Sequence, residues 1–258
     1  MCLMKRILSA AAVLALSASL LVGCSSGTAS SVPASASSAA ESTVSSVEET
    51  ASSAVDENEA AAAQLLNDLT GSYQELWPVI LADEYKQTWL DDCTALVGED
   101  NAEAAFEKLS SMVTGDVYGE DAVKAYANGG GAYFCGFTNS LATLTFDGET
   151  STISGTDKDG NVLFSHTYHY IGMEPVRGLY EFESDDADSG EFTYFFLAPD
   201  TSAETYHIEF RYGSDAEALS QYDAGEYAYW LASGISTDCD QTMINNGIEL
   251  FCTENLAG

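Results

Sequence analysis

Hydrophobic and polar positions follow different periods in the two halves of the chain. In the first half, apolar residues recur at three- and four-residue spacing, as on one face of a helix, at 65–69, 83–96 and 101–113. Ser72 and Glu75 have the spacing of a capping box ahead of an apolar run, which predicts that a helix begins there. We therefore expect three helices before any strand.

After three glycines at 129–131 the apolar period changes to two, which is typical of half-buried strands. Seven segments of this kind follow, at 132–138, 142–146, 150–154, 162–170, 178–183, 192–197 and 205–211. Asp-Gly dipeptides at 147–148 and 159–160 favour hairpin turns. Strands this short and this close together predict an antiparallel meander that closes into a barrel or a sandwich.

The last part of the chain gives a weaker pattern. Ser214 and Glu217 repeat the capping-box spacing and predict a helix that continues through Tyr222. The segment 236–255 follows neither period clearly and is left unassigned.

The N-terminus has the features of an export signal. Two positive residues precede an uncharged apolar stretch at 7–23, which is typical of a secretory signal and short for a membrane span. The stretch ends in LVGC, where a small residue directly precedes Cys24 as in a bacterial lipobox. We expect residues 1–23 to be removed and Cys24 to carry a lipid that holds the chain at the extracellular face of the cytoplasmic membrane. An uncleaved anchor is the alternative.

The segment that follows has little that could form a core. Residues 24–60 are rich in Ser and Ala and contain no aromatic residue. Such a segment buries too little apolar surface to offset the entropy lost on ordering, so we expect a disordered tether. The remainder, 61–258, has the length of one domain.

Charge limits the classes of partner. The chain has 8 Lys and Arg against 41 Asp and Glu, a formal net charge of −33. Nucleic-acid binding needs clustered cations, so this class is excluded, and anionic lipid headgroups are repelled as well. Membrane attachment is therefore expected only through the lipid on Cys24.

Four cysteines remain in the expected domain: Cys93, Cys135, Cys239 and Cys252. An even number in an exported chain favours two disulfides, for which three connectivities are possible. We predict the pairs Cys239 with Cys252 and Cys93 with Cys135.

The three histidines are the candidate nitrogen ligands. His166 and His169 are three positions apart, so on a strand they lie on opposite faces and cannot share a cation. His207 and Glu209 are two positions apart, share one face of the 205–211 strand and can approach one cation. The alternative is an ordinary polar strand face, on which Glu209 pairs with Arg211 across water.

Other candidate sites have structural explanations. The acidic run 157–161 begins like a calcium loop but lacks its later Gly and acid, so we expect a hairpin turn. The acidic cluster at 185–191 is expected to be a solvated loop, with a calcium site as the alternative. No Gly-rich phosphate loop, nucleophile elbow or H-E-x-x-H motif occurs, and no nucleophile, base and orienting group can be assembled. We therefore expect a binding protein and not an enzyme.

Several segments together resemble a known family. In chain order they are SYQELWP at 72–78, VRGLYEF at 176–182, FLAP at 196–199 and YHIEFRYGS at 206–214. Over residues 62–235 the chain resembles the ZinT (YodA) zinc-binding proteins, which also occur as a domain of Gram-positive zinc-uptake lipoproteins. The resemblance implies an α+β fold, mainly β: a calycin-like, lipocalin-related antiparallel barrel with helices packed at its N-terminal side.

The resemblance also implies a zinc site, from which this chain departs. The family's three histidines correspond here to Phe195, Thr205 and His207, so one of three remains, and the tether lacks the family's His-rich segment. Carboxylates such as Glu204 and Glu209 are the candidate replacements and would favour harder ions. The implied function is uptake or buffering of zinc or another divalent metal ion through a weakened site, with a metal ABC transporter as partner.

Two alternatives belong to other classes. A calycin pocket for a small apolar ligand is favoured by 14 Tyr and 11 Phe, which core packing explains equally well. A structural or partner-docking surface lipoprotein is the second.

Overall fold

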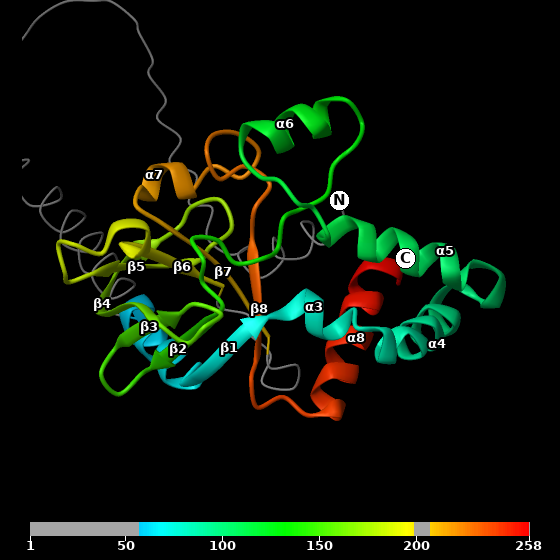
Figure 1. Ribbon diagram of the computed structural model, residues 1–258, viewed down its shortest axis with the longest axis horizontal. Coiled ribbons are helices and arrows are strands. Elements are labelled where there is room, and N and C mark those ends of the chain that lie inside the picture. The colour runs from blue at the N-terminus through cyan, green and yellow to red at the C-terminus, as the bar shows by residue number, and fades with distance from the viewer. Residues whose placement is uncertain (1–56, 199–206, 258) are drawn as a thin grey trace, which may run out of the picture.

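The computed structural model describes residues 57–198 and 207–257 (Figure 1). The signal segment, Cys24 and most of the expected tether lie outside these residues. The first described element is a helix over residues 57–68, and the expected boundary between residues 60 and 61 falls within it. No helix in the described ranges has the length and apolar character that crossing a membrane requires.

Eight antiparallel strands form a closed barrel in which each strand pairs with its neighbours in sequence and β8 closes on β1 (Figure 1). The strands are β1 Gly71–Glu75, β2 Thr143–Asp147, β3 Thr152–Thr156, β4 Val162–Met173, β5 Tyr180–Ser184, β6 Tyr194–Leu197, β7 His207–Gly213 and β8 Ala232–Ser236. This is the up-and-down closure of lipocalin-type barrels. The predicted α+β fold with a calycin-like antiparallel barrel is confirmed.

Helices pack beside the barrel, and four of them form a second core. They are α3 Leu76–Ile80, α4 Lys86–Val97, α5 Glu99–Val113, α6 Glu120–Ala127, α7 Ala216–Leu219 and α8 Gln241–Leu256, with short 3-10 turns η2 Asp83–Tyr85 and η3 Gly190–Phe192. Figure 1 shows α3, α4, α5 and α8 on one side of the barrel. Their buried apolar residues join Ile235 of β8 in one cluster. The predicted packing of N-terminal helices on the barrel is confirmed, and the unassigned tail supplies α8 to the same layer.

Six of the seven predicted strands correspond to β2 through β7. The segment 132–138 is not a strand, because its Phe134 makes only isolated bridges to Thr114 and Trp230. The sequence pattern missed β1 and β8. Residues 232–236 read ASGIS, whose small side chains give almost no apolar alternation, so β8 is recognisable only from its two neighbours.

The predicted helix start at Ser72 is wrong. Residues 71–75 form β1, in which Tyr73 is buried and the Ser72 hydroxyl lies 2.8 Å from the hydroxyl of Thr145 on β2. The Glu75 side chain does not cap α3, which begins at Leu76. Pairing with β2 and β8 outweighs the local capping pattern here, since barrel closure satisfies more backbone groups than one short helix would.

The barrel interior is filled by side chains. Aromatic rings dominate it, and Ala62, Leu65 and Leu66 of the helix over residues 57–68, with Leu69 just after it, belong to the same core cluster. At Gly148, in the β2–β3 turn, a Cβ would lie 2.4 Å from the backbone Cα of Asn67, so this turn accepts only glycine against that helix. Among the described residues, these side chains pack against one another in a single core cluster.

Aspartates cap the two C-terminal helices. Asp215, and not the predicted Ser214, accepts a hydrogen bond from Ala218 N at the start of α7. Asp240 accepts from Thr242 N and Met243 N at the start of α8. In both cases a carboxylate satisfies backbone donors that the first turn leaves open.

Both predicted disulfides are wrong. All four cysteines are free thiols, and the Sγ atoms of Cys93 on α4 and Cys252 on α8 face each other at 3.9 Å. Cys239 precedes α8 and Cys252 lies near its end, so the helical rise separates them by about 16 Å, far beyond the span of a disulfide. The spacing of the cysteines along the chain could not predict which thiols lie close together, because that depends on how α8 packs on α4.

Candidate functional site

His207 and Glu209 lie on the outward face of β7. The residues that alternate with them, Ile208, Phe210 and Tyr212, belong to the barrel core. His207 pairs in register with Ile235, whose side chain joins the helical core outside the barrel. Both His207 and Glu209 are partly exposed. The predicted shared face is therefore confirmed.

Phe195 lies on the other side of the barrel wall. It pairs in register with Tyr212, is fully buried, and stacks in the interior on Tyr212 and Phe210, with ring centroids 5.4 and 6.4 Å away. Phe195 and His207, two of the three positions that correspond to the family's histidines, thus do not converge, because Phe195 faces inward and His207 faces outward. Thr205 and Glu204 lie outside the described residues.

Arg211 is the third outward-facing polar residue of β7, and it does not meet water. Its guanidinium is fully buried and donates hydrogen bonds to the carbonyl oxygens of Leu219, Gln221 and Tyr227. Burial lowers the pKa of Arg211 to about 10. The alternative prediction, a water-separated pair of Glu209 and Arg211 on an open face, is wrong for Arg211.

The other two histidines face opposite sides of β4, as predicted. His166 Nδ1 lies 2.8 Å from Asp186 Oδ2, and His169 Nδ1 lies 2.7 Å from Asp185 Oδ1. His166 also stacks on Phe164, and its side chain is only 16% exposed, against 53% for His169. Each imidazole is thus oriented by its own carboxylate.

The acidic turn at 157–161 is a hairpin turn, as predicted. Asp157 accepts hydrogen bonds from Asp159 N, Asn161 N and Asn161 Nδ2, and Gly160 has a positive φ. These bonds to the carboxylate lower the pKa of Asp157. Within residues 57–198 and 207–257, no group of three or more His, Cys, Asp or Glu side chains could hold a metal ion.

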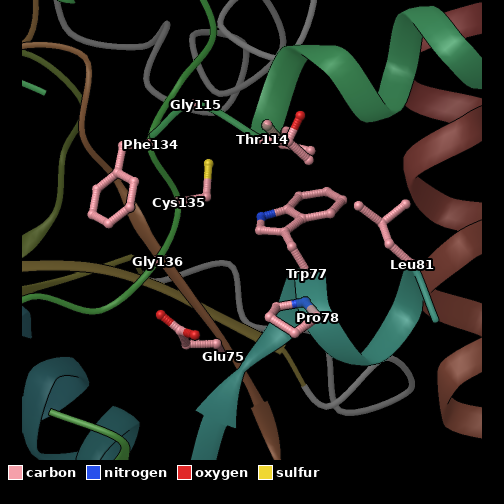
Figure 2. A pocket seen from close by; sticks show the side chains of 10 residues that line it. Glu75, Trp77, Pro78, Leu81, Thr114, Gly115, Phe134, Cys135 and Gly136 are labelled. Carbon is pink, nitrogen blue, oxygen red and sulfur yellow. The ribbon is translucent and has the colours of Figure 1, made fainter. Parts of the chain in front are cut away.

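A cavity of about 340 Å³ lies where the barrel wall meets the helical layer (Figure 2). It is bounded by the end of β1, by α3, by the end of α5 and by the segment 134–136. The lining residues are Glu75, Trp77, Pro78, Leu81, Val113, Thr114, Gly115, Phe134, Cys135 and Gly136. Its volume is at the low end of ligand pockets, so it suits a small molecule.

Cys135 connects this cavity to the outward face of β7. Its carbonyl oxygen accepts a hydrogen bond from Ser233 N, and Ser233 pairs in register with Glu209. Burial, and after it the negative charge of Glu209, raises the pKa of the Cys135 thiol to about 12. The thiol therefore stays protonated at neutral pH and is a poor metal ligand and nucleophile.

Sequence reasoning missed the cavity because its residues come from three separate segments, 75–81, 113–115 and 134–136. Glu75 was assigned to a helix cap, and Phe134 and Cys135 to a strand. The alternation around the buried Tyr73 is the one pattern that favours β1 over a helix and so places Glu75 at a strand end.

No family model and no curated protein matches the chain. Two solved structures are similar to it. The Zn(II)-bound ZinT-like domain of Streptococcus pneumoniae AdcA is 16% identical with a TM-score of 0.45, and the match covers 71% of this chain and 89% of that one. Zn(II)-bound AdcA from the same organism is 15% identical with a TM-score of 0.42, and the match covers 75% of this chain and 35% of that one.

Proposed function

We propose that this chain is a lipid-anchored extracellular binding protein of the ZinT-like type, not an enzyme, which holds zinc or another divalent metal ion weakly at His207 and Glu209. The shared outward face of β7 carries the proposal: it presents an imidazole and a carboxylate, two positions apart and both partly exposed. An imidazole nitrogen and a carboxylate oxygen are common zinc ligands. A net charge of −33 raises the local concentration of cations around them.

The donor set accounts for a weak site. Zinc takes four ligands, and the described residues offer two at this face, so water completes the coordination. Because this face offers one imidazole and one carboxylate, affinity is expected to be about 10³-fold or more below that of a three-histidine site. The role that follows is buffering or low-affinity capture, with hand-over to a metal transporter in the same membrane.

Calorimetric titration of zinc into the chelator-stripped, full-length chain in detergent tests the site. His207→Ala is expected to abolish the specific binding, and Glu209→Gln to weaken it at least ten-fold. His169→Ala is the matched control, because His169 is also exposed and also lies on an outward strand face, beside Asp185. Equal binding by wild type and His207→Ala would place the metal elsewhere and refute the proposal.

A second variant separates this site from the family pattern. Phe195→His places an imidazole in the barrel interior, behind the wall that carries His207. We expect no gain in zinc affinity, together with a loss of stability of about 2–4 kcal/mol, since an unpaired polar ring replaces a packed one. A gain in affinity would mean that the two positions converge on one ion.

Lipid anchoring at Cys24 is tested separately. Mass spectrometry of the membrane-extracted protein is expected to show a mature chain that begins at Cys24 and carries a diacylglycerol mass. An intact 1–23 segment, or an unmodified Cys24, would contradict the anchoring.

A further inference from the structure

The cavity between the barrel wall and the helical layer has one fixed negative charge. Glu75 Oε1 accepts a hydrogen bond from Phe137 N at 2.6 Å, which holds the carboxylate in place. No described residue donates a hydrogen bond to its second oxygen, Oε2. The lining contains no Lys or Arg, so the cavity itself supplies no counter-ion to Glu75.

Gly136 brings this carboxylate next to an aromatic ring. A Cβ on Gly136 would lie 2.8 Å from Glu75 Oε1 and 3.1 Å from Phe134 Cζ, so both groups rest against the same backbone position. Any larger residue at 136 would push them apart. Glycine here permits a carboxylate oxygen and an aromatic edge to occupy one corner of the cavity.

The rest of the wall is apolar. Trp77 is only 7% exposed, and Figure 2 shows its indole turning its nitrogen edge toward Cys135 and Gly136. The buried Nε1 has no hydrogen-bond partner among the described residues. Pro78, Leu81 and Val113 add aliphatic surface, and the neutral thiol of Cys135 adds no charge.

We infer that this cavity binds a small organic ammonium ion: a protonated amine on an apolar body. The ammonium group matches the second oxygen of Glu75, while the apolar body packs against the aromatic and aliphatic parts of the wall. Small anions are disfavoured by Glu75 and by the net charge of −33. A divalent metal ion finds one carboxylate in the lining, too few ligands for a metal site. This inference goes beyond the proposed metal site at His207 and Glu209, because both the ligand and the residues that would bind it are different.

Benzylamine and benzyl alcohol test the inference as a matched pair. They share shape and ring, but at neutral pH only the amine carries a positive charge. Calorimetric titration into the full-length chain in detergent is expected to show benzylammonium binding at least ten-fold tighter than the alcohol. Glu75→Gln, which keeps an acceptor for Phe137 N, is expected to erase that difference and leave binding of the alcohol unchanged. Glu103→Gln, an exposed acid on α5, is the charge control and should behave like wild type.

Leu81→Trp fills the cavity and is expected to abolish binding of both compounds. If Glu75→Gln does not fold, Leu81→Trp still tests whether the ligand binds in this cavity. The comparison of amine and alcohol on the wild-type chain still tests whether the positive charge is recognised. Equal affinity for amine and alcohol, absence of saturable amine binding, persistence of the difference in Glu75→Gln, or unchanged binding in Leu81→Trp would each overturn the inference.

Discussion

A single buried arginine holds the segment between β7 and β8 on the barrel. Arg211 satisfies three backbone carbonyls of residues 219–227, and its guanidinium lies over the Tyr222 ring, 4.4 Å from the centroid. Because the folded segment shields those carbonyl oxygens from water, they need a hydrogen-bond donor from the protein. The cost of burying the charge, visible in the lowered pKa of Arg211, is offset by these bonds.

Replacement of Arg211 should therefore be severe. Arg211→Met is expected to lower the free energy of unfolding by about 3–5 kcal/mol, because it leaves buried acceptors unpaired. Arg211→Lys keeps the charge but loses the planar fork, so an intermediate loss is expected. Urea denaturation measures both.

The control is Arg177→Met. Arg177 also lies over the Tyr222 ring, 4.0 Å from the centroid, but it is only partly buried, so a loss below about 1.5 kcal/mol is expected. Equal losses for the Arg177 and Arg211 variants would show that the carbonyl contacts do not carry the effect.

At the scale of elements, periodicity identified those whose apolar pattern is strong and missed those that depend on neighbours. Six strands and the helices α4 and α5 follow directly from spacing. β1 was read as a helix start, β8 is made of small residues, and α6 is only eight residues long. Each of the three is defined by what packs on it, which local propensity does not encode.

The N-cap of α8 gives a test at this scale. Asp240 accepts hydrogen bonds from Thr242 N at 2.8 Å and Met243 N at 3.0 Å. Asp240→Ala is expected to cost about 1 kcal/mol, seen as a lower urea midpoint with an unchanged slope. Asp238→Ala removes the same charge from a nearby exposed position without removing a cap, and a loss as large there would show that charge and not capping is responsible.

For the molecule as a whole, some features of the candidate site could be predicted from the sequence and others depend on tertiary contacts, as was found for the fold. The common face of His207 and Glu209 follows from the period of a strand and was predictable. Phe195 faces the opposite side of the wall because of the register of β6 with β7. No local sequence pattern predicts that register. The cavity beside Glu75 forms where three segments distant in sequence meet, so it needed the three-dimensional structure.

Because buried thiols and phenols have raised pKa values, the folded state is expected to lose stability as the pH rises into the alkaline range. Burial raises the pKa of Cys135 from 9.0 to about 12, and that of Tyr73 and Tyr126 from 10.0 to about 12. Above about pH 9 the unfolded chain therefore releases protons that the folded chain retains, which favours unfolding. The urea midpoint should be nearly constant between about pH 7 and pH 9 and fall from there to about pH 12, less steeply in Tyr73→Phe. A midpoint independent of pH over this range would contradict the burial of these groups.

The proposed function requires that the outward face of β7 holds the metal ion. Anomalous diffraction at the zinc absorption edge, from crystals of the full chain equilibrated with zinc, locates the ion directly. We expect one strong peak about 2 Å from an imidazole nitrogen of His207 and from a carboxylate oxygen of Glu209. A peak at the His166 and Asp186 pair instead, or none at β7 in zinc-saturated crystals, would contradict it.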